Sequence, residues 1–374
     1  MDFELTQAQQ VIATSAAEVL LAAEAGPSDA GPSDAGPSGA GAAWQALAKA
    51  GLLALTLPGW LGGDDLGVLD AAVLLAEVGR RAAAVPALAT IMLGALPVAR
   101  WGDKALQERV LAGVGAGEVI LTAAVREQSA PFPRMPATVA RAGTVSGTKV
   151  GVPYAAQASW LLIPAALASG GRAVVLVERA GTGVSLSPAP VSGTAPEYTV
   201  RLDAAPIAGM LGAGQHGASQ HGAGAAVDDL YQLALAGAVA AGDGALAGAL
   251  DLTAGYIARR EQFGRPLATF QAVAQQIADV YVASRTLHLA ALSACWRLGA
   301  GLDAAGDVDV AAYWLAEEAP AAMRTCHHLH GGIGLDAEYP LHRYSALITD
   351  LVRFTGGAGY RLDALTEQGG GNAD

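Results

Sequence analysis

Apolar residues recur at helical spacing in the first third of the chain. In the first such stretch, Leu5, Ile12, Ala16 and Leu20 lie on one face of a helix. The pattern predicts helices over residues 4–25, 42–54, 69–80, 87–99 and 104–112. The same period returns after residue 226 and predicts helices near 227–261, 269–299, 307–330, 340–352 and 356–367.

A segment with a different residue pattern separates these two helical regions. Short β-branched runs bounded by turn residues predict strands at 119–125, 144–147, 159–163, 173–177 and 197–202. The sequence therefore predicts an α+β fold that is mostly α. We expect a helical domain over 1–118, a small β domain over 119–207, a loop over 208–226 and a helical bundle over 227–374.

Near the N-terminus, a GlyProSerAspAla unit occurs twice and is followed by GlyProSerGlyAla. Such low complexity is typical of a flexible insert, which we place at 26–41 and to which we assign no function.

Composition narrows the possible functions. With 52% hydrophobic and 15% charged residues, the chain can bury a large core. A net charge of −12 argues against nucleic acid as a main partner. Cys295 and Cys326 lie in apolar helical patterns, which favours buried thiols over a disulfide framework. The first ten residues lack the basic start of a signal peptide, and apolar runs are interrupted by Gly, Pro or charge. We therefore expect a cytoplasmic protein without a membrane span.

The most informative motif is ArgArgGluGlnPheGlyArgProLeu at 259–267. It places an arginine pair, an amide and an aromatic ring where one predicted helix ends and the next begins. Arginine offers a planar fork of donors that suits a phosphate or pyrophosphate, and the start of a helix adds backbone N–H groups.

A second motif, HisHisLeuHisGlyGlyIleGlyLeu, follows at 327–335. Its glycines allow another backbone or a ligand to approach closely. The spacing of His327, His328 and His330 puts at most two of them on one helix face, without a carboxylate. His216 and His221 also lack Cys or carboxylate neighbours, so we predict no metal site.

Together the two motifs resemble those of the acyl-CoA dehydrogenase family, and the resemblance covers almost the whole chain. It implies an N-terminal helical domain, a β-barrel-like domain and a C-terminal four-helix bundle, with FAD as cofactor. In that family the two motifs bind the ADP half of a neighbouring subunit's FAD. The residues that the resemblance assigns to FAD are Arg260, Gln262, Phe263, Leu267, Phe270, Gln271, Val273, His328, Gly331 and Gly332.

The resemblance fails where the family carries its own chemistry. The catalytic base is usually a Glu in a Tyr-Glu-Gly-Thr-like motif, but the matching stretch, 348–357, places Arg353 near that position. In members that place the base and a CoA-binding arginine early in the first bundle helix, the positions fall near Ala234 and Leu235. The Trp and Thr that contact the flavin are replaced by Gly151 and Pro153, and proline has no hydroxyl or N–H.

The chain thus keeps the residues that the family lends to a neighbouring subunit's FAD, and it lacks those that a subunit uses for its own flavin and substrate. This combination favours a heteromer. The pattern resembles the shorter subunit of α2β2 bacterial acyl-CoA dehydrogenases of steroid side-chain degradation. That resemblance implies FAD shared with a paralogous catalytic subunit, an acyl-CoA substrate bound mainly by the partner, and an electron-transfer flavoprotein as acceptor. We therefore predict no catalytic residue in this chain itself.

Two alternatives remain open at the level of sequence. The chain could be a homo-oligomeric dehydrogenase with a relocated base, Asp243 or Glu338, or a scaffold with no flavin role. Asp243 lies on an apolar Ala/Gly helix face, where a carboxylate needs a partner. We favour a structural carboxylate bonded within the bundle, and its glycine neighbours indicate close helix packing.

Overall fold

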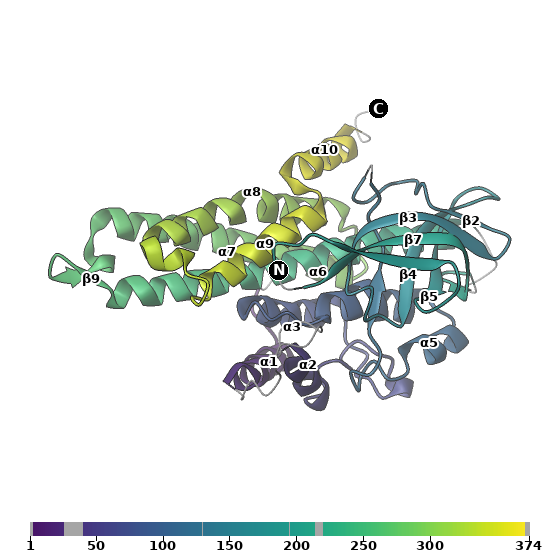
Figure 1. The fold of residues 1–374 in the computed structure, drawn as a ribbon, viewed down its shortest axis with the longest axis horizontal. Coiled ribbons are helices and arrows are strands. Elements are labelled where there is room, and N and C mark those ends of the chain that lie inside the picture. The colour runs from purple at the N-terminus through teal and green to yellow at the C-terminus, as the bar shows by residue number, and fades with distance from the viewer. Residues whose placement is uncertain (1–2, 26–39, 129, 194, 214–219, 371–374) are drawn as a thin grey trace. The chain divides into compact units, whose positions relative to one another are not determined.

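The computed structural model describes residues 3–25, 40–128, 130–193, 195–213 and 220–370 (Figure 1). Most of the insert predicted over 26–41 lies outside the described residues, as does His216. The chain forms two compact units, which we describe separately. Unit 1 contains residues 1–17, 72–83 and 238–374, and unit 2 contains 18–71 and 84–237. Residues on both sides of the boundaries predicted at 118 and 207 therefore belong to the same unit.

The helices of the first third lie close to the predicted ranges. They are α1 (Gln7–Ala25), α2 (Ala40–Lys49), α3 (Val68–Arg80), α4 (Leu96–Trp101) and α5 (Lys104–Leu111). The segment predicted as one helix over 87–99 is π-helical over Leu88–Ala95 before α4 begins. Helix α5 starts at Asp103, whose carboxylate accepts a hydrogen bond from the Leu106 N–H at 2.8 Å. That contact is a typical N-cap and explains the start of the helix.

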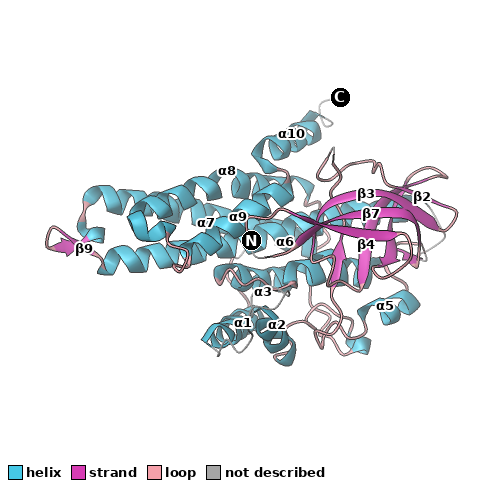
Figure 2. Cartoon of the chain, viewed as in Figure 1, coloured by secondary structure: helices cyan, strands magenta, loops and turns pink. Residues whose placement is uncertain are grey.

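One sheet lies in unit 2 (magenta in Figure 2). Its strands are β1 (Leu121–Ala123), β2 (Val139–Arg141), β3 (Thr144–Pro153), β4 (Trp160–Leu167), β5 (Arg172–Glu178), β6 (Val184–Ala189), β7 (Glu197–Pro206) and β8 (Gly209–Met210). The order is β6-β7-β3-β2-β4-β5-β8, and β1 pairs with β4. Strands β1 and β2 run parallel to β4, and the other pairs are antiparallel.

Each predicted strand is present, but β2, β6 and β8 were not predicted. Strands β4 and β5 are apolar and almost fully buried, so their pattern was easy to recognise. Strand β6 reads ValSerLeuSerProAla, pairs with β7 at the edge of the sheet and has no buried residue. An edge strand needs little apolar surface and tolerates proline, which is why hydrophobicity does not reveal it.

Long helices return after the sheet: α6 (Gln220–Arg259), α7 (Gln271–Gly299), α8 (Ala305–His330), α9 (Leu341–Thr355) and α10 (Gly357–Gly370). Helix α6 begins inside the loop predicted over 208–226. Between Gly222 and Arg259 it is long and apolar enough to cross a membrane, but 89% of its apolar window is buried inside the protein. It is therefore a core helix.

Glycines let α3 and α6 pack with their backbones in contact within unit 1. A Cβ added at Gly244 would lie 1.8 Å from the carbonyl oxygen of Ala76, and one at Gly79 would lie 2.0 Å from that of Ala241. A Cβ at Gly242 would meet Leu315 Cδ1 at 2.4 Å. The close packing indicated by the glycines around Asp243 is therefore present on two sides of α6.

We expect Gly244→Ala to lower the free energy of unfolding by about 1–3 kcal/mol, because α3 and α6 must move apart. The change opposes helix propensity, which favours Ala over Gly by about 1 kcal/mol. Chemical denaturation of the variant would measure the difference. The matched control is Gly224→Ala on the same helix, where an added Cβ meets nothing within 4 Å. Equal stability of the two variants would contradict this close contact.

Candidate functional site

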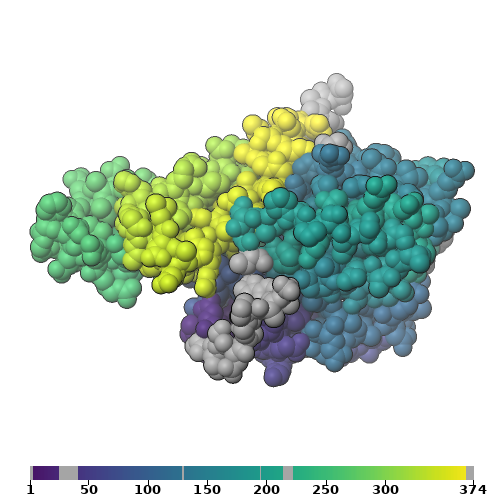
Figure 3. Space-filling view, viewed as in Figure 1, coloured from purple at the N-terminus to yellow at the C-terminus, as the bar shows by residue number. Residues whose placement is uncertain are grey.

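The first motif folds into a small hairpin between α6 and α7. Strand β9 (Glu261–Gln262) pairs with β10 (Arg265–Pro266), and the two residues between them are Phe263 and Gly264. Both have positive φ, +54° and +76°, as in a type I′ turn. The Leu267 N–H donates to the Arg260 carbonyl at 2.8 Å and closes the loop. We call residues 260–267 the tip hairpin; it stands at the surface of unit 1 (green in Figure 3).

The side chains of the tip hairpin are presented outward rather than packed. Arg260 and Gln262 are exposed, and Phe263 is 93% exposed. The positive φ of Phe263 is an unfavourable backbone conformation for a bulky residue. Phe270 is half-buried, because Arg265 stacks on its ring at 4.0 Å and the Phe263 ring lies 6.3 Å away. The hairpin therefore offers an unpacked aromatic ring beside a guanidinium and an amide.

The first turn of α7 adds backbone donors next to this hairpin. Its N-cap residue, Phe270, makes no side-chain hydrogen bond to the helix. Gln271 is exposed and Val273 is half-buried. The first N–H groups of a helix have no intrahelical partner, so they can bind an anion together with the helix dipole.

Two histidines fix the second motif, which we call the HisGlyGly turn (residues 327–335). His327 Nδ1 lies 2.9 Å from the Gly334 carbonyl, and its Nε2 lies 2.5 Å from Ser345 Oγ. Gly331 has φ +63°, and the short helix η4 (Gly331–Leu335) follows it. The imidazole thus ties the turn to α9.

His330 holds the other side of the turn. Its Nδ1 lies 2.8 Å from the Cys326 carbonyl and its Nε2 lies 3.0 Å from Tyr339 Oη. The Tyr256 ring, on α6, stacks on the imidazole at 4.6 Å. Burial lowers the pKa of His330. His327 and His330 are therefore both bonded within the protein, and Tyr256 connects the HisGlyGly turn to the end of α6.

Unlike His327 and His330, His328 is exposed, and Gly331 and Gly332 are exposed as well. It lines a shallow groove between α7 and α8 with Gln276, Arg324 and Thr325. Arg324 was not identified from sequence. Its position one helical turn before His328 is the signal that could have found it.

The usual places for a catalytic base hold other residues. Arg353 forms an ion pair with Asp350 at 3.0 Å, and the stretch 348–357 contains no glutamate. Ala234 and Leu235 are buried in α6. Glu338 is exposed in the turn before α9. The two positions at which the family places its base, near Arg353 and Ala234, therefore hold no carboxylate.

Asp243 has the bundle partner that its burial requires. Its Oδ2 lies 2.8 Å from His288 Nδ1 on α7, and the residue is 6% exposed. Nine residues at about 100° each place Asp243 on the opposite face of α6 from Ala234. The contact favours the structural interpretation over that of a relocated base.

The side-chain space at Gly151, where the resemblance places a flavin-contacting tryptophan, is filled. Gly151 has φ +59°, and a Cβ there would lie 2.8 Å from Arg126 Nη1 and 3.0 Å from Glu197 Oε2. Pro153 pairs with Glu197 and its carbonyl accepts the Thr122 hydroxyl at 2.8 Å. A tryptophan at 151 would meet these charged groups. This strand therefore lacks both the side chain and the space for the family's flavin-contacting tryptophan, whereas the exposed donors of the tip hairpin fit a phosphate.

Metal chemistry has no support in the part of the chain that the structure describes. Among those residues no group of three or more His, Cys, Asp or Glu side chains could hold a metal ion. Both cysteines are buried and free, and burial raises the pKa of Cys295 to about 12.

The fold and motifs define a flavin-dependent dehydrogenase scaffold, and comparison with known proteins agrees. Residues 6–118 match the acyl-CoA dehydrogenase N-terminal domain, and residues 221–360 match the acyl-CoA dehydrogenase C-terminal domain. Acyl-CoA dehydrogenase FadE28 of Mycobacterium tuberculosis is 44% identical over 98% of both chains.

Solved structures give the same result. A chain of the ChsE4–ChsE5 complex from Mycobacterium tuberculosis is 30% identical, with a TM-score of 0.86 over 98% of both chains. A chain of the Tcur3481–Tcur3483 steroid ACAD is 32% identical, with a TM-score of 0.82 over 98% of this chain and 97% of that one.

The chain belongs to the acyl-CoA dehydrogenase family of flavin-dependent oxidoreductases. The predicted family, fold class and cofactor, FAD, are thereby confirmed.

Proposed function

We propose that this chain is a half-site subunit of a heteromeric FAD-dependent acyl-CoA dehydrogenase. By half-site we mean that it completes the FAD site of a paralogous catalytic subunit and has no base of its own. The partner supplies the glutamate base and the flavin cradle. Bound FAD would accept hydride from the β-carbon of the thioester. This chain contributes Arg260 and Gln262 of the tip hairpin, the start of α7, and His328 of the HisGlyGly turn.

One observation supports this division most strongly. The donors that suit the ADP half of FAD are exposed, while Arg126 and Glu197 occupy the side-chain space at Gly151, where the family's flavin-contacting tryptophan would stand. A self-sufficient dehydrogenase needs both the ADP donors and the side chains that contact the flavin ring. A chain with the first alone can only complete a site that another subunit supplies.

The comparisons support the nature of the partner and substrate. The neighbours with about 30% identity include a complex of two differently named chains, ChsE4 and ChsE5, and a steroid ACAD. We infer an α2β2 assembly with a paralogous chain, acting on a steroid side-chain CoA thioester bound mainly by the partner. We expect an electron-transfer flavoprotein as acceptor and the cytoplasm as location.

The test is to purify this chain alone and co-expressed with a paralogous dehydrogenase chain, and to record the visible spectrum and mass of each. We expect flavin absorbance only in the complex, at one FAD per two unlike chains. Stoichiometric flavin on this chain alone would instead indicate a homo-oligomeric enzyme. A colourless complex would indicate a scaffold.

A further inference from the structure

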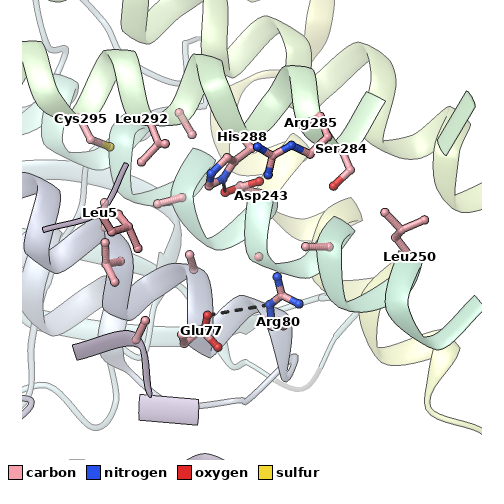
Figure 4. Close-up of a pocket in the computed structure, with 18 of the residues that line it drawn as sticks. Leu5, Glu77, Arg80, Asp243, Leu250, Ser284, Arg285, His288, Leu292 and Cys295 are labelled. Atoms are coloured by element: carbon pink, nitrogen blue, oxygen red, sulfur yellow. Dashed lines mark hydrogen bonds and ion pairs between the residues drawn. The ribbon is translucent and has the colours of Figure 1, made fainter. Parts of the chain in front are cut away.

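A cavity of about 250 Å³ lies within unit 1 (Figure 4). The residues that line it include none from the tip hairpin or from the HisGlyGly turn. Helices α1, α3, α6 and α7 surround it. Its apolar wall includes Val73, Leu250 and Leu292, and its polar groups come from α3, α6 and α7. A mostly apolar cavity with a few convergent polar groups is the usual form of a small-molecule site.

The Asp243–His288 pair provides the first polar group. In the neutral imidazole, the 2.8 Å contact with Asp243 Oδ2 assigns the proton to Nδ1. His288 Nε2 then carries a lone pair and can accept a hydrogen bond. The carboxylate fixes both the tautomer and the orientation of the ring.

Ser284 provides the second group. It precedes His288 by four residues on α7, so both side chains lie on the same face of the helix, as Figure 4 shows. Ser284 is 4% exposed, and none of the described residues forms a hydrogen bond with its hydroxyl. Ser284 lines the cavity, where its hydroxyl can donate a hydrogen bond to a ligand.

The charges around the cavity restrict the ligand. Glu77, Asp243 and Asp251 contribute three carboxylates against the guanidinium groups of Arg80 and Arg285. Arg80 forms ion pairs with Asp251 and, at 3.9 Å, with Glu77. Burial raises the pKa of Glu77. The three carboxylates outnumber the two guanidinium groups, so the surroundings disfavour an anionic ligand.

We propose that this cavity binds a small neutral molecule with an apolar body and one hydroxyl group. The ligand hydroxyl donates to His288 Nε2 and accepts from Ser284 Oγ–H, while the body lies against the apolar wall. The site opens on the face of α6 opposite Ala234, so it is separate from the position of the family's base and from the shared FAD site. Its occupancy is independent of the proposed half-site role.

The probe is tert-butylcyclohexanol, titrated calorimetrically into the co-expressed complex. Its methyl ether lacks the donor hydrogen, and tert-butylcyclohexanecarboxylate adds a negative charge. We expect the alcohol to bind, and each analogue to bind about three- to tenfold more weakly, the factor that one neutral hydrogen bond contributes. Equal affinity for the ether, tighter binding of the carboxylate, or no binding of the alcohol would overturn the proposal.

Ser284→Ala separates a ligand contact from a structural role. Because the hydroxyl bonds to none of the described residues, the variant should keep its melting temperature and bind the alcohol about three- to tenfold more weakly. The matched control is Ser293→Ala on the same helix, whose hydroxyl donates to Asp307 at 3.1 Å outside the cavity. It should bind the alcohol like the wild type. Unchanged affinity in Ser284→Ala would refute the assignment.

Discussion

Arg260→Ala is expected to remove FAD from the co-expressed complex. The guanidinium is exposed where α6 ends, close in sequence to the first N–H groups of α7, which have no intrahelical partner. A charge-assisted hydrogen bond contributes about 1.5–3 kcal/mol, so loss of the guanidinium should weaken FAD binding by about ten- to hundredfold. The flavin absorbance per mole of complex after gel filtration measures this directly.

The control is a variant that also loses one arginine, but at a position to which we assign no role in FAD binding. Arg201 is exposed on β7, so Arg201→Ala should keep full flavin content. Arg260→Lys should bind FAD with intermediate affinity, because an ammonium keeps the charge but not the planar fork of donors. Full flavin retention in Arg260→Ala, with the complex still assembled, would exclude this arginine from the site.

Much of this fold could be predicted because its signals are local. Periodicity located the helices of both helical regions, and the tip hairpin was found because its residues are consecutive. The start of α6 was placed too late, since the glycine-rich stretch around Gly222 and Gly224 has low helix propensity. Strand β6 was missed because an edge strand needs little apolar surface.

Other features depend on contacts between distant residues, which a single sequence does not reveal. The sequence shows that Gly151 stands where the family has a tryptophan. It does not show which side chains fill the space of the missing tryptophan. Glu197 reaches this position because β7 pairs with β3, and Arg126 reaches it because its carbonyl accepts a hydrogen bond from the Val150 N–H of β3. Likewise, the burial of Asp243 could be predicted, whereas its partner His288 lies 45 residues away on another helix.

The filled strand position is held in place by a buried ion pair next to it. Lys149 Nζ lies 2.7 Å from Glu127 Oε1, and Lys149 is fully buried. The same carboxylate accepts hydrogen bonds from the N–H groups of Ala137 and Thr138, at 2.7 and 3.0 Å. The Val150 N–H donates to the Arg126 carbonyl at 3.1 Å. Glu127 therefore fixes the segment that carries Arg126 against β3.

We expect Glu127→Gln to lower the free energy of unfolding by about 3–5 kcal/mol, because it leaves the Lys149 ammonium buried without its carboxylate. Burial lowers the pKa of Lys149 to about 8 even with this partner present. Burial alone would raise the pKa of Glu127, but its bonds to Lys149, Ala137 and Thr138 outweigh that effect and lower it. Since the folded pKa of Glu127 lies below the unfolded value, the wild type loses this stabilisation as the pH falls below about 4.3.

Chemical denaturation at neutral pH and in acid would measure both effects, and the difference between wild type and variant should shrink in acid. Glu178→Gln, at the exposed end of β5, is the matched control and should change stability little. Adding Lys149→Met to Glu127→Gln should recover most of the loss, because no unpaired charge then remains buried. If the double variant is no more stable than Glu127→Gln, the cost arises from the lost bonds to Ala137 and Thr138 rather than from the stranded ammonium.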